Sequence, residues 1–139
     1  MAAFNKFNLF SEDLCRALHN FNSGGATYKV LLTNTAPVAT NHLYGDISAG
    51  EVANGNGYTT GGATSAMSDS SASGVESVVA ANVTWTATGA VGPFRYAVVY
   101  RSDSTNKEMI CWFDYGSSIS LASGDTFTVQ FSATFFTVT

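Results

Sequence analysis

The hydrophobic positions near the start of the chain follow a helical period. Leu14, Leu18 and Phe21 recur at helical spacing, and Ser11 is a suitable N-cap residue just before them. The glycine-containing segment Asn22–Gly25 then interrupts the pattern. The pattern predicts one N-terminal helix that begins at Ser11, with His19 on its solvated edge.

After residue 25 the period changes to two, in short runs rich in β-branched and aromatic residues. No strand–helix–strand alternation follows, so the pattern predicts a mainly β fold, an antiparallel β-sandwich of jelly-roll-like type, over residues 26–139. Residues 1–25 form an N-terminal arm and helix in this scheme. The predicted strands are Thr27–Thr33, Ala63–Ser68, Val75–Ala80, Val83–Thr88, Phe94–Ser102, Lys107–Tyr115 and Thr126–Val138, the last of which is long enough for two strands.

Two of these strands can be aligned in register. Pairing Arg101 with Glu108 also places Arg95 opposite Asp114, so one choice creates two ion pairs on one face. Trp112 lies on that face, and if the face is open to solvent, Trp112 is the best single candidate for an exposed contact residue. A slip of one residue would exchange the two faces. The other face is uniformly apolar and is the predicted core: Phe94, Tyr96, Val98, Tyr100, Met109, Cys111, Phe113 and Tyr115.

Four large apolar residues lie close to the N-terminus: Phe4, Phe7, Leu9 and Phe10. Phe10 could act as a hydrophobic staple before the helix, or the helix could begin earlier and include it. Burying four such side chains is worth about 1.5–3 kcal/mol each. Ordering about ten residues costs about 1–2 kcal/mol per residue, a sum at least as large. We therefore expect this arm to be ordered against a neighbouring molecule.

The composition narrows the class of function. Only 12% of the residues are charged, the net charge is −4, and the six basic residues are scattered, which argues against a nucleic-acid surface. The chain has no signal-peptide pattern and no apolar run long enough for a membrane helix. Cys15 and Cys111 lie in apolar contexts typical of buried thiols, so we expect synthesis in a cytoplasm.

The sequence contains no pattern typical of a catalytic, metal or cofactor site. The glycines of Gly55–Gly62 lack the spacing and the following helix of a phosphate-binding loop. His19 and His42 have no further ligand at metal-binding spacing. We therefore predict a protein that is not an enzyme and has no cofactor. Exposed Trp112, Tyr44 and Tyr58 would instead favour a glycan-binding or host-surface module.

Five segments of the chain carry a resemblance to a known family. They are KFNLFSEDL (Lys6–Leu14), YKVLLTNTAPVATN (Tyr28–Asn41), GNGYTTGG (Gly55–Gly62), VGPFRYAVVY (Val91–Tyr100) and WFDYGSSISLASGDTFTV (Trp112–Val129). These segments resemble a family of small structural proteins of tailed bacteriophages, some of which are capsid decoration, or cement, proteins. The similarity covers nearly the whole chain in the same order and involves turns and core strands. It is weakest over the Ser/Ala-rich residues 65–81.

The resemblance implies a virion protein made in the bacterial cytoplasm that binds the outside of the capsid. Its expected partners are the major capsid protein and itself, as a dimer or a trimer, with neither nucleic acid nor membrane involved. The expected interface residues, toward the capsid or a sister subunit, are Phe4, Phe7, Leu9, Phe10 and Trp112.

Overall fold

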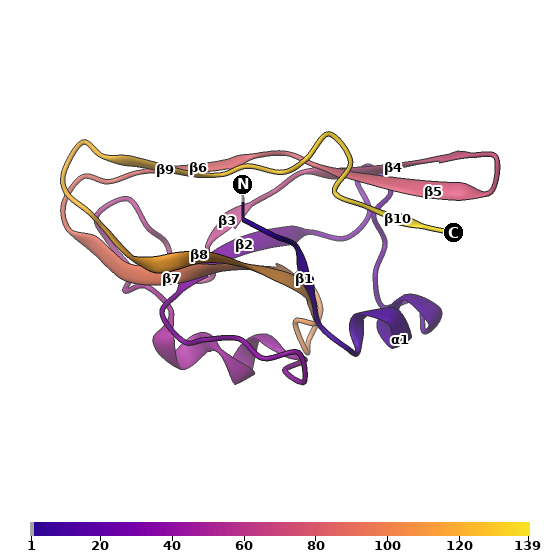
Figure 1. The fold of residues 1–139 in the computed structure, drawn as a ribbon, viewed down its shortest axis with the longest axis horizontal. Coiled ribbons are helices and arrows are strands. Elements are labelled where there is room, and N and C mark those ends of the chain that lie inside the picture. The colour runs from indigo at the N-terminus through magenta and orange to yellow at the C-terminus, as the bar shows by residue number, and fades with distance from the viewer. Residues whose placement is uncertain (1) are drawn as a thin grey trace.

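The computed structural model describes residues 2–139 and has antiparallel strand pairing throughout the described sheets (Figure 1). Short 3-10 turns lie at Tyr44–Asp46 and Ser48–Gly50. The other elements are β1 (Asn5–Lys6), α1 (Phe10–Cys15), β2 (Tyr28–Thr33), β3 (Ala63–Thr64), β4 (Met67–Ala72), β5 (Val75–Ala80), β6 (Val83–Thr86), β7 (Val91–Arg101), β8 (Met109–Leu121), β9 (Thr126–Val129) and β10 (Phe136–Val138).

The strands form two layers. One layer is a five-stranded sheet of order β1-β8-β7-β2-β3, and the other consists of the sheets β10-β5-β4 and β6-β9. The larger core cluster joins the layers, because Val30 and Val99 of the first pack with Val78, Trp85 and Val129 of the second. The prediction of a mainly β, antiparallel sandwich is thus confirmed, whereas its jelly-roll connectivity stays a prediction.

The strand boundaries follow the sequence pattern closely in the middle of the chain. β5 has the predicted bounds, and β2 begins one residue later than predicted. The predicted strand Ala63–Ser68 is divided between β3 and β4, and Thr126–Val138 is divided between β9 and β10. β1 has only two residues and was not predicted.

The five-stranded sheet is buried on both faces. Val52 and Tyr58 pack in the larger cluster, whereas residues 34–50, with the two 3-10 turns, lie over the face away from the other layer and contribute Ile47 to a second apolar cluster. Val98 and Tyr100 of β7 belong to this cluster, whereas Ala97 and Val99 face the larger one. The condition under which Trp112 would be an exposed contact residue is therefore not met, because a connecting segment covers this face of the hairpin.

A β-bulge shifts the register of the β7–β8 hairpin. Next to the loop the predicted pairing holds, since Tyr100 is opposite Met109 and the Arg101 amide donates to the Glu108 carbonyl at 2.9 Å. Beyond it, Val99 is opposite Cys111 rather than Ile110. The sequence gives no sign of the extra residue Ile110, because its neighbours are also apolar. The predicted register, and the predicted division of side chains between the two faces of the hairpin, therefore fail from this point on.

The two expected ion pairs had different outcomes. Arg95 pairs with Asp114 through Nε and Nη2, at 2.7 and 3.0 Å, although the residue directly opposite Asp114 is Tyr96. Arg101 pairs with Asp103 at 2.8 Å instead of Glu108. Long side chains reach a diagonal neighbour, so an ion pair does not determine the backbone register.

The N-terminal helix is shorter than the pattern predicts. It begins at Phe10, with Leu9 rather than Ser11 at the N-cap, and ends at Cys15. Ala17 then has a φ of 57°, which the right-handed helix does not allow. Phe21 is buried, but it reaches the core from a nonhelical segment and stacks on Tyr28 at a centroid distance of 4.8 Å. Similar spacing of apolar residues thus arose without a continuous helix.

Candidate binding site

Backbone hydrogen bonds attach the N-terminal segment at β1 to the body. Asn5 and Lys6 of β1 pair with Trp112 and Cys111 of β8. The Phe7 amide continues this pairing by donating to the Ile110 carbonyl at 3.1 Å. These bonds were missing from the sequence-based energy balance, which therefore underestimated how well the chain holds its own N-terminal segment.

Two of the expected interface residues are covered by the chain itself. Phe7 is fully buried, with its ring centroid 4.7 Å from that of Trp112, which is half-buried. Phe10 is 3% exposed and packs against Phe21 and Phe136. The expectation that these side chains need a neighbouring molecule to cover them is therefore wrong for Phe7 and Phe10, and Trp112 is not on an open face.

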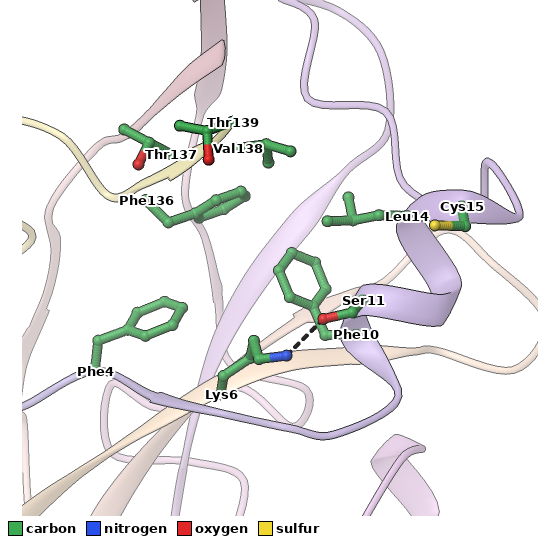
Figure 2. Close-up of a pocket in the computed structure, with 10 residues that line it drawn as sticks. All are labelled: Phe4, Lys6, Phe10, Ser11, Leu14, Cys15, Phe136, Thr137, Val138 and Thr139. Carbon is green, nitrogen blue, oxygen red and sulfur yellow. Dashed lines mark hydrogen bonds between the residues drawn. The ribbon is translucent and has the colours of Figure 1, made fainter. Parts of the chain in front are cut away.

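Phe4 and Leu9, in contrast, are each 36% exposed, a large fraction for such side chains. Phe4 lies beside an apolar cleft of about 450 Å³ between β1, α1 and β10 (Figure 2). Figure 2 shows β10 on one side of this cleft, the β1 segment opposite it, and α1 closing one end. The residues that line the cleft are Phe4, Lys6, Phe10, Ser11, Leu14, Cys15, Phe136, Thr137, Val138 and Thr139.

Lys6 supplies the charge at the cleft. Among its described lining residues, Lys6 is the one with an ionisable cationic side chain, and its Nζ donates to the Ser11 hydroxyl at 2.5 Å. No carboxylate of residues 2–139 forms an ion pair with it. The cleft therefore combines apolar walls with a cation that has no charged partner, an arrangement typical of binding sites.

The α1 wall of the cleft is fixed to the body by buried polar contacts. Asp13, on the side of α1 away from the cleft, is 1% exposed, and its two carboxylate oxygens lie 2.9 and 3.1 Å from His42 Nε2. Arg101 Nη1 donates to the Leu18 carbonyl at 2.5 Å, just after the helix. These contacts compensate for the short length of α1, which could not form a stable helix alone.

His19 lies behind this wall with no hydrogen-bond partner on either ring nitrogen among the described residues. Its ring stacks on Phe21 at a centroid distance of 5.6 Å and meets Phe10 edge-on at 5.2 Å. Burial lowers the pKa of His19 to about 4. The prediction of a solvated histidine is wrong, because the helix on whose edge it was placed ends before it.

The described histidines, cysteines and carboxylates form no group of three that could hold a metal ion. Around Asp13, His42 is in contact with the carboxylate, and His19 Nε2 lies 4.0 Å from it. We therefore interpret these residues as a support for α1.

A second polar cluster involves residues proposed for glycan binding. Glu51 accepts hydrogen bonds from the hydroxyls of Tyr44 and Tyr58, at 2.5 and 2.8 Å, and from the Gly61 amide at 2.6 Å. Tyr58 is 2% exposed, and Tyr44 is half-buried and stacks on Tyr100 at 5.2 Å. Burial and the Glu51 hydrogen bond raise the pKa of Tyr44 to about 12. The expected platform of exposed aromatic rings is therefore not formed.

None of the described helices is long and apolar enough to cross a membrane. Comparison of the chain with models of protein families, with curated proteins and with solved structures found no match in any of the three.

Proposed function

We propose that this protein is a structural component of a tailed-bacteriophage virion. It binds the outside of the capsid without catalysing a reaction and joins neighbouring major capsid protein subunits, which stabilises the head. It acts as a homo-oligomer, a dimer or a trimer, and is made in the cytoplasm of the bacterial host.

The observation that carries the proposal is the partly open apolar cleft beside the N-terminal segment. Phe4 and Val138 at this cleft are 36% and 42% exposed, and Leu9, also 36% exposed, lies between β1 and α1. Clustered exposed apolar side chains are typical of protein-binding surfaces. The sequence resemblance to cement proteins and the small share of charged residues, 12%, agree with a role in an assembly.

Binding to capsid shells tests this function directly. Purified protein is mixed with shells of the encoding phage that lack it, and the pellet is analysed after sedimentation. We expect saturable binding in a fixed ratio to the major capsid protein, and a higher temperature of shell disruption. Shells that neither bind the protein nor gain stability would contradict the proposal.

The alternative, a host-surface or glycan-binding module of a head or tail fibre, has less support. Two of its three aromatic residues, Tyr44 and Tyr58, are held by Glu51, and the third, Trp112, packs on Phe7. A glycan array separates the two functions, because a cement protein should give no saturable signal on it.

A further inference from the structure

An edge strand from each layer of the sandwich lies beside the same cleft. β1 is the outermost strand of the five-stranded sheet, and β10 is the outermost strand of the order β10-β5-β4. Among the described residues, β1 is paired only with β8, and β10 only with β5. Lys6 of β1 and Phe136, Thr137 and Val138 of β10 line the cleft from opposite sides (Figure 2).

The β10 edge is short, with three residues, and lacks the charged side chains that natural sheets often place on an edge. Proteins keep exposed edges from pairing with other chains by placing charged or polar residues on them. The opposite edge of the same sheet follows this rule, because β4 exposes Ser68, Asp69, Ser70 and Ser71. β10 carries Phe136, Thr137 and Val138, without a charge, and Val138 is 42% exposed. One edge is thus polar and partly charged, whereas the other is uncharged, exposes Val138 and borders a cavity.

The charge at the cleft indicates which kind of segment would fit. Lys6 is held toward the cleft by its hydrogen bond to Ser11 and has no ion-pair partner among residues 2–139 (Figure 2). A carboxylate would complement this amine, and apolar side chains would complement Phe4, Phe136 and Leu14. Because strand addition uses main-chain hydrogen bonds, the segment must be extended.

We propose that an extended, apolar segment of the major capsid protein adds to the β10 edge and inserts its side chains into this cleft, with an acidic residue placed against Lys6. The site thus combines backbone pairing for affinity with an apolar cavity and one cation for specificity. This inference rests on the proposed function, since it names the place where the capsid is bound.

Cys15 provides a built-in probe of the site. It lines the cleft and is exposed, whereas Cys111 is fully buried. The experiment compares the rate at which N-ethylmaleimide modifies Cys15 in the free protein and in protein bound to capsid shells. We expect at least a tenfold slower reaction on the shell. The matched control carries Cys15→Ser and Thr105→Cys, which moves the thiol to an exposed position in the β7–β8 loop and should react at similar rates in both states.

A charge variant tests the cation independently. Lys6→Glu should weaken binding to shells roughly fivefold or more, since it replaces an attraction at the rim with a repulsion. Lys29→Glu is the matched control, because Lys29 is half-buried in β2 and also lacks an ion pair among residues 2–139. It should leave the affinity unchanged, and thermal unfolding of both variants verifies that they fold.

The outcomes separate this inference from the function on which it rests. Absence of any binding to shells overturns both. Normal binding with Cys15 as reactive as in the free protein overturns the docking site and leaves the function standing. If Cys15 of the free protein reacts more slowly as the protein concentration rises, the occupant of the cleft is a second copy of this chain. That result would also overturn the inference.

Discussion

The buried ring of His19, whose nitrogens form no hydrogen bond among residues 2–139, makes the stability of the fold depend on pH. The folded state holds the pKa of this ring at about 4, whereas the unfolded chain has an ordinary histidine with a pKa of 6.5. The unfolded state therefore binds the proton more tightly, so the stability is complete above pH 6.5 and decreases as the pH falls toward 4. Each unit of pKa difference corresponds to about 1.4 kcal/mol.

With these two pKa values, the free energy of unfolding should fall by about 2 kcal/mol at pH 5 and about 3 kcal/mol at pH 4, relative to neutral pH. Other ionisable or charged side chains lie near His19, namely Asp13, His42, Glu108 and Arg101. A direct measurement of the wild type alone would sum their effects, so the prediction concerns the difference from a variant without the imidazole.

His19→Phe is the natural comparison, because the ring lies among Phe10, Phe21 and Tyr28. Urea unfolding of both proteins between about pH 7.5 and pH 4 gives the two stability curves. The wild type should lose about 3 kcal/mol more than the variant over this range. His19→Met gives the same test if the larger ring does not fit, and His42→Gln controls for the neighbouring histidine. Parallel curves for the wild type and both His19 variants would refute the reasoning.

Three further predictions concern residues around the two clusters. Phe7→Ala should destabilise the protein by about 3–5 kcal/mol, because it opens a cavity in the second cluster. Phe4→Ala should cost less, about 1–2 kcal/mol, because Phe4 is 36% exposed but its ring packs edge-on against Phe113 and Phe135; thermal unfolding measures both. Cys15 should react with a thiol reagent in the native state and Cys111, whose pKa is raised by burial, only after unfolding, as a thiol count with and without denaturant will reveal. The Tyr44 phenol should ionise near pH 12, and Glu51→Gln should lower the pKa of Tyr44. Ultraviolet titration measures this pKa, and Tyr44→Phe identifies which part of the signal comes from Tyr44.

The sequence predicts the elements whose signals are local. The run Val75–Ala80 is rich in β-branched valine and lies between Gly74 and Asn82, residues typical of turns, so its strand could be located to the residue. The hairpin loop likewise determined the pairing of Tyr100 with Met109. Beyond that point the register depended on a bulge, which an apolar run such as Met109–Phe113 does not reveal, because residues on both faces are apolar.

The candidate site could be predicted only in part. Phe4 and Phe10 were selected because large apolar residues near a terminus are unusual, and both line the cleft. Val138 and Cys15 were missed, since their contribution depends on where β10 and α1 meet, which is a tertiary contact. His19 was misplaced for a related reason: the helical period continued past Cys15 in the sequence, while the backbone turned at Ala17.

The bulge in β8 has a consequence for how this chain can change length during evolution. Ile110 and Cys111 both face the larger cluster, so deletion of Ile110 would leave the pairs Tyr100–Met109 and Val99–Cys111 in place. It would cost the core one side chain and would remove the carbonyl that accepts from the Phe7 amide. Loss of Phe113 instead would turn Asp114 toward the core, because it would invert the alternation that follows. Single-residue deletions should therefore be tolerated better at the bulge than a few positions later, where selection should eliminate them.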